Sequence, residues 1–176
     1  MKKTLLILFC LFVICNISNA QYFSASGGTG LALNLTSNSN NSVFGFNFVH
    51  AQGMYTISPL IATRLNFQLY DFPGKSVDTW YGTQSYDALL LIIIKGDFMI
   101  GNFERNASMQ PYGYISPGIA IPTGGGGPFF HIDFGGGANF HIANNFYITA
   151  ETGFGIVTSS PAGLYLPFRG GIKYDF

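Results

Sequence analysis

Apolar and polar residues alternate with a period of two along the last third of the chain. In three segments, 130–142, 146–156 and 164–176, the even positions are mostly apolar and the odd positions are mostly polar or glycine. The odd positions include charged residues such as Asp133 and Glu151. This alternation indicates β-strands that have one apolar face and one polar face.

The rest of the chain shows weaker alternation between segments rich in turn-forming residues. Segment 86–100 is apolar on both faces until Lys95, and segment 110–121 contains Pro117, so their registers are the least defined. Breaks are predicted at 37–42, 58–59, 72–84, 102–109, 122–128, 143–145 and 158–162. Seven breaks predict eight strands, and hence an all-β, eight-stranded, antiparallel up-and-down transmembrane β-barrel.

The first twenty residues have the pattern of a secretory signal peptide. Lys2 and Lys3 precede an apolar stretch over 4–15, and small residues at Ser18 and Ala20 suit a signal peptidase. Cleavage after Ala20 would leave 21–176 as one barrel domain. A membrane anchor is the alternative, but the apolar run is too short to span hydrocarbon.

Composition favours lipid as the solvent of this domain. Charged residues make up only 9% of the chain and aromatic residues 16%, whereas soluble domains usually carry about 25% charged residues. Both cysteines, Cys10 and Cys15, lie in the predicted signal peptide, so disulfides and thiol chemistry are not expected after its cleavage. In a lipoprotein, Cys15 would be the acylated residue, but the bulky Ile14 before it does not suit cleavage of a lipoprotein signal. No basic patch for nucleic acid is present.

A barrel is the expected way for this chain to cross a membrane. No apolar run after the leader approaches the roughly 20 residues that a membrane helix needs. Backbone groups in hydrocarbon must be paired, and a closed barrel has no unpaired edge. With both ends of the barrel domain in the periplasm, breaks 37–42 and 72–84 become outer loops, and 102–109 becomes an unusually long periplasmic turn.

The last third of the chain resembles the OmpA/OmpX-like family of small outer-membrane β-barrel proteins. The motifs that carry the resemblance are Gly135–Phe140, Asn145–Ile148, Glu151–Gly155 and Gly170–Phe176. The resemblance implies a monomer in the bacterial outer membrane with a structural or adhesive role. It also implies that Ile172, Tyr174 and Phe176 form the C-terminal signal that the barrel-assembly machinery reads.

Charged residues collect on the face that this barrel would turn inward. They are Arg64, Lys95, Asp97, Asp133, Glu151, Arg169, Lys173 and Asp175. The interior of an eight-stranded barrel is just wide enough for side chains to fill, and buried charges are costly unless they pair. A structural ion-pair network is the favoured interpretation, and a gate for a narrow ion path is the alternative.

Catalytic, metal and cofactor sites are not expected. His131 and His141 are too far apart along one strand to share a metal, and Ser116, His131 and Asp133 do not form a recognisable hydrolase motif. Aromatic residues near strand ends are expected to form membrane-interface girdles, namely Tyr55, Tyr70, Phe98, Tyr112, Phe140 and Phe146.

The leading functional hypothesis is a non-enzymatic outer-membrane barrel with a structural or surface-interaction role. It would contact the lipid bilayer, and its outer loops could meet an extracellular partner. A porin-like narrow pore is the alternative, followed by a soluble lipocalin-type barrel that turns its apolar face inward. A lipid-modifying barrel enzyme is the least favoured class.

Overall fold

Eight antiparallel strands close into a barrel in the computed structural model, which describes residues 21–36, 44–79, 82–86, 88–124, 127–158 and 163–176. The predicted signal peptide, residues 1–20, lies outside the described residues. Within the described part of the chain, no helix is long and apolar enough to cross a membrane.

The barrel follows the chain order from strand to strand. Its strands are β1 (Tyr22–Asn34), β2 (Phe44–Ser58), β3 (Ile61–Phe72), β6 (Leu89–Gly101), β7 (Met109–Pro122), β8 (Phe129–Ala143), β9 (Phe146–Val157) and β10 (Gly163–Asp175). Strands β1 and β10 form the seam, which pairs from Ser24 with Asp175 to Asn34 with Tyr165. The predicted eight-stranded antiparallel barrel is therefore confirmed.

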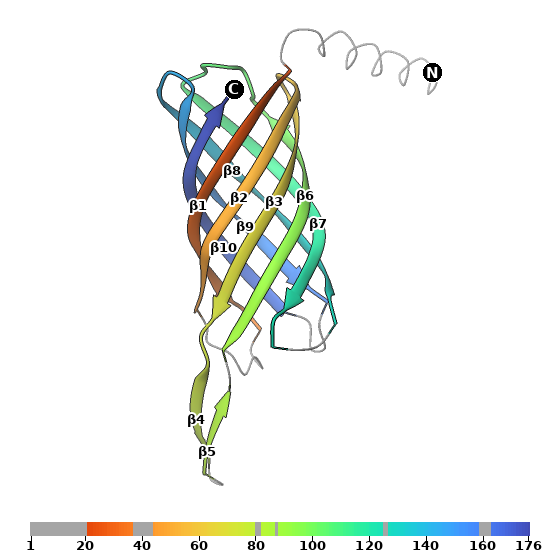
Figure 1. Ribbon diagram of the computed structural model, residues 1–176, viewed down its shortest axis with the longest axis vertical. Helices are drawn as coiled ribbons and strands as arrows, with labels where there is room; N and C mark the ends of the chain where they lie inside the picture. Colours follow the sequence, from red (N-terminus) through yellow and green to blue (C-terminus); the bar gives the residue numbers. More distant parts are fainter. Residues whose placement is uncertain (1–20, 37–43, 80–81, 87, 125–126, 159–162) are drawn as a thin grey trace, which may run out of the picture.

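A two-stranded hairpin extends the connection between β3 and β6 beyond the barrel, as the lower part of Figure 1 shows. It consists of β4 (Lys75–Thr79) and β5 (Gly82–Tyr86), which pair only with each other. The sequence predicted a plain loop over 72–84. Strand-favouring residues such as Val77 and Thr79 alternate with polar ones here, in a run too short to stand out in the sequence.

We call the end of the barrel that carries β4 and β5 the hairpin end, and the opposite end the turn end. The turn end holds the start of β1, the end of β10 and the turns after β2, β6 and β8 (Figure 1). The turns after β2 and β8 contain only two residues each, as expected for periplasmic turns. The turn after β6 is much longer, as the sequence predicted.

The alternation seen in the sequence separates the outside of the barrel from its lumen. Large apolar side chains such as Leu65, Ile148 and Ile172 lie on the outer wall, with exposed fractions of 67%, 49% and 56%. Two aromatic residues expected in the girdles, Tyr70 and Tyr112, instead point into the lumen and are 0% and 6% exposed. That part of the prediction was wrong, because aromatic character near a strand end does not tell which face a residue occupies.

Strand β7 continues through Pro117, where the sequence suggested an interruption. Pro117 faces outward and lies opposite Ile132 of β8. Pairing between β6 and β7 breaks beside it, between Lys95–Gly118 and Phe98–Ile115. Proline has no N–H to donate. Because the β6–β7 pairing is interrupted at this point, β7 can include Pro117 and continue.

Candidate functional site

The middle of the lumen holds a chain of alternating charges that crosses the barrel. Arg64 of β3 pairs with Asp97 on the neighbouring strand β6 and with Glu151 on β9. Glu151 also approaches Arg169 of β10, with 3.3 Å between Oε2 and Nε. Each of these side chains is at most 4% exposed.

The chain of charges continues from Arg169 and ends on β6, the strand that also carries Asp97. Arg169 Nη1 lies 3.1 Å from Asp133 Oδ2 on β8, and Asp133 pairs with Lys95 of β6. The order of charges is thus Asp97, Arg64, Glu151, Arg169, Asp133, Lys95. Because each charge lies beside one of opposite sign, the cost of burying it is offset, and the chain links β3, β6, β8, β9 and β10 through the lumen.

Tyrosine side chains complete the surroundings of this chain. Tyr112 donates its hydroxyl hydrogen to Glu151 Oε1 over 2.6 Å. Three cations lie over the ring of Tyr114, with Arg169 Cζ 5.5 Å and Arg64 Cζ 5.8 Å from its centroid and Lys95 Nζ 5.8 Å from it. From the sequence, Tyr112 was expected in a membrane-interface girdle, and Tyr114 was assigned to neither face. They could have been found from the even-numbered run 110–116, which is polar or aromatic throughout.

Lys173 and Asp175, the two remaining candidates, pair with each other apart from this chain of charges and nearer the turn end. Lys173 Nζ is 2.9 Å from Asp175 Oδ1, donates to Gln110 Oε1 over 2.8 Å and lies 4.3 Å from the ring centroid of Tyr147. Asp175 also accepts a hydrogen bond of 2.8 Å from Ser24 on β1. This smaller cluster connects β10 with β7, β9 and β1.

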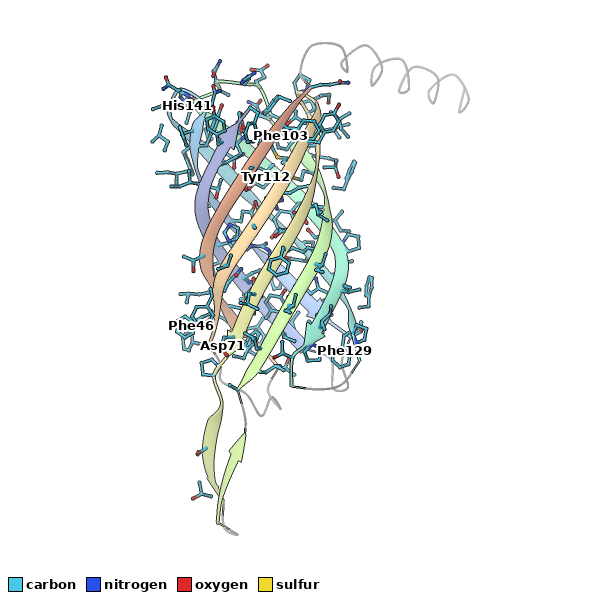
Figure 2. The ribbon with its side chains drawn as sticks, in the orientation of Figure 1. Phe46, Asp71, Phe103, Tyr112, Phe129 and His141 are labelled. Carbon is cyan, nitrogen blue, oxygen red and sulfur yellow. The ribbon has the colours of Figure 1, made fainter. Side chains whose placement is uncertain are left out.

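Two apolar clusters lie on either side of the charges. The hairpin-end cluster consists of Ala32, Tyr70, Phe72, Leu91, Ile93, Ala120, Val157 and Tyr165. The turn-end cluster consists of Met54, Ala62, Met99, Phe103, Tyr112 and Tyr114. Figure 2 shows Phe103 close to the turn end, with Tyr112 further into the barrel. The six charges that pair across the middle of the lumen thus lie between apolar side chains on both sides.

Inward glycines provide the space for the large side chains of the lumen. A Cβ atom at Gly155 would lie 2.2 Å from Tyr165 Cζ, and one at Gly137 would lie 2.9 Å from Tyr112 Oη. A Cβ at Gly153 or Gly135 would lie 2.8 Å from Tyr114 Oη. These glycines therefore leave room for the neighbouring tyrosine side chains.

The arrangement around His131 does not suit hydrolysis. His131 Nε2 lies 2.6 Å from the Tyr165 hydroxyl rather than beside a carboxylate, while Asp133 pairs with Lys95 and Arg169. The Ser116 hydroxyl has no hydrogen-bond partner among the described residues, and all three candidates are fully buried. Nucleophilic catalysis needs a serine in contact with its base and open to substrate. Among the described residues, no group of three or more acidic, histidine or cysteine side chains could hold a metal ion.

The three residues of the predicted assembly signal lie at the turn end of β10 and just beyond it. Ile172 and Phe176 are exposed on the outer wall, and the half-buried Tyr174 packs against Phe146 and Phe176, with ring centroids 4.8 Å and 5.1 Å apart. The three side chains thus share the outer face. Their role in assembly stays a prediction.

No protein-family model and no curated protein matches the chain. Solved structures are similar to it in fold. The outer membrane protein OprG from Pseudomonas aeruginosa aligns with a TM-score of 0.69 at 8% identity, over 89% of this chain and 96% of that one.

Two further structures align over similar lengths. Neisserial surface protein A (NspA) gives a TM-score of 0.55 at 15% identity, over 90% of this chain and 98% of that one. Ail, the attachment invasion locus protein of Yersinia pestis, gives 0.56 at 12% identity, over 89% and 99%. The closed barrel of eight antiparallel strands and these alignments indicate the same fold. The chain has the fold of the small eight-stranded outer-membrane β-barrels, the OmpA/OmpX-like kind.

Proposed function

We propose that this protein is a non-enzymatic, integral outer-membrane barrel with a closed lumen, which presents its outer connections to the surroundings of the cell. Residues 1–20 would direct export and be removed, and the barrel-assembly machinery would read Ile172, Tyr174 and Phe176 during insertion. The protein would act as a monomer in the outer-membrane bilayer.

The filled lumen is the observation that carries this proposal. Asp97, Arg64, Glu151, Arg169, Asp133 and Lys95 pair across the middle of the barrel, between the apolar hairpin-end and turn-end clusters. A permeating ion would have to separate buried ion pairs and pass apolar side chains, which is costly. The lumen therefore favours a structural scaffold over a pore.

The β4–β5 hairpin supports a role at the cell surface. It extends past the barrel rim at the end opposite the start of β1 (Figure 1). Rigid scaffolds commonly carry binding residues on such connections. One neighbour in fold is named a surface protein, Neisserial surface protein A, and another is named for attachment and invasion, which is consistent with this role.

The absence of conductance is the first expected result. Full-length protein, produced in cells, purified from the outer membrane and inserted into planar bilayers, should give no stable ion current. Insertion is verified on the same sample by a gel shift between unheated and boiled protein, so that failure to insert is not mistaken for a closed lumen. Stable single-channel steps from verified barrels would instead favour the narrow pore.

Cleavage by trypsin in intact cells tests the orientation. Trypsin cuts after lysine and arginine, and the basic residues of 21–176 are four luminal ones, Lys75 at the start of β4, and Arg105 in the turn after β6. External trypsin should cut after Lys75, and Lys75→Ala should abolish that cut. Cleavage after Arg105 in intact cells would show that the turn end faces outward and would contradict the proposed surface role of the hairpin.

A further inference from the structure

The long turn after β6 lies across the mouth of the barrel at the turn end. We call this segment, Asn102–Ser108, the crossing turn. Strands β6 and β7, from which it arises, lie opposite the seam strands β1 and β10 in the barrel order. Yet the crossing turn contacts Tyr22 of β1, Tyr147 of β9 and Phe176 beyond β10. It therefore spans the lumen from one wall to the other.

Phe103 fills the mouth from inside the crossing turn. Its side chain is 0% exposed and stacks on Tyr112, with 6.0 Å between ring centroids. It belongs to the turn-end cluster together with Met54 and Met99. Backbone groups hold it in place, because Phe103 N–H donates to Pro59 O over 2.6 Å and Tyr22 Oη donates to Phe103 O over 2.9 Å. Phe103 is thus buried at the mouth and anchored through both its N–H and its carbonyl group.

Arg105 attaches the crossing turn to both strands of the seam. Its Nη2 donates to Phe176 O over 3.0 Å, and its Cζ lies 5.8 Å from the ring centroid of Tyr22. Phe176 N–H in turn donates to Phe23 O over 2.9 Å. One side chain thus contacts the start of β1 and the residue after β10, where the two strands meet.

The remaining contacts give the crossing turn a fixed shape. Asn106 adopts a positive φ of 66°, which asparagine tolerates better than most residues. Its N–H donates to the Tyr147 hydroxyl over 3.0 Å, and Gln110 Nε2 donates to Glu104 O over 2.9 Å. Periplasmic turns of such barrels are usually short, whereas the crossing turn has seven residues.

We propose that the crossing turn is a built-in plug, which closes the lumen at the turn end with Phe103 and fastens the β1–β10 seam through Arg105. This inference rests on the proposed function, in which that end faces the periplasm. It assigns closure of the lumen at the turn end to a segment that takes no part in the strand pairing of the barrel.

Reactivity of a single luminal thiol tests the plug. Met54→Cys places a thiol in the turn-end cluster at a position that is 4% exposed. In isolated outer membranes, a small cationic methanethiosulfonate should modify it at least tenfold faster when Phe103→Ala is also present. The unmodified chain, labelled in parallel, gives the blank. Phe98→Ala, which removes an outward side chain of β6, should leave the rate unchanged.

An accessible thiol serves as the reference rate. Ser108→Cys lies on an exposed residue of the crossing turn and should react rapidly with and without Phe103. If Met54→Cys reacts as fast as this reference while Phe103 is present, or if Phe103→Ala does not accelerate it, the plug is wrong. If Phe103→Ala does not fold, Phe103→Leu should give a smaller acceleration, and no acceleration would overturn the inference.

The seam function of Arg105 has a separate readout. Arg105→Gln should lower the urea concentration at which half of the barrels unfold in lipid vesicles, while Lys75→Gln in the hairpin should not change it. Equal midpoints for Arg105→Gln and the unmodified chain would overturn the seam function. If the chain without substitutions fails to enter the outer membrane, the proposed function is contradicted. If inserted barrels carry a Met54→Cys thiol that reacts rapidly while Phe103 is present, only the plug is contradicted.

Discussion

Replacing Glu151 with alanine is expected to destabilise the barrel by about 3–5 kcal/mol, the usual effect of removing one partner from a buried ion pair. Glu151 lies between Arg64 and Arg169 and accepts a hydrogen bond from Tyr112. Without it, two guanidinium groups lose a shared counter-charge where water cannot replace it. The free energy of unfolding would be measured by urea titration in lipid vesicles, with the fraction folded read from the gel shift.

The chain provides a matched control for this substitution. Glu104 is the other glutamate, and it is exposed in the crossing turn. Glu104→Ala should change stability by less than about 0.5 kcal/mol, as is usual for surface substitutions. The double variant Arg64→Met/Glu151→Leu should cost less than the sum of its single variants, because the two residues are directly coupled. A Glu151→Ala effect as small as that of Glu104→Ala would mean that water screens the lumen.

The outward face of the barrel could be predicted from sequence because lipid is a uniform solvent. Every outward position in the membrane meets the same hydrocarbon, so Ile148 and Ile172 follow one rule, and period-two alternation reveals it. The inward charges of Arg64 and Glu151 follow from the same alternation. Their direct contact does not, since the two residues are 87 positions apart and meet only once the barrel closes.

Local irregularities were beyond the reach of the alternation. In β2, Phe48 and Val49 are both exposed, because an extra residue shifts the register between Asn47 and Val49 against β3. Before this β-bulge the odd-numbered residues of β2 point inward, and after it the even-numbered residues do. His50 is therefore luminal, although Phe48, two residues earlier, faces outward. Tyr70 was misassigned for a different reason. Hydrophobicity alone does not distinguish a luminal aromatic residue from an interfacial one.

Placing an arginine on the outer wall is expected to have the second large effect, and it tests which solvent contacts that wall. Leu65 lies next to Arg64 on β3 but on the opposite face, and its side chain is 67% exposed. Leu65→Arg should cost about 2–4 kcal/mol in a bilayer, the range found for cations at the midplane of such barrels. The same vesicle titration measures it.

The position of the substitution along the barrel supplies the control. Ile100 of β6 is 61% exposed and pairs with Ile61, the first residue of β3, so it lies beside the turn end. Ile100→Arg should cost only about 0–1 kcal/mol, because a cation near the interface reaches water. Two equally small effects would mean that water surrounds the outer wall. Arg64 is tolerated one residue away because Asp97 and Glu151 pair with it inside the lumen. Comparing arginine at positions 64 and 65 therefore keeps the residue type constant and changes only its surroundings.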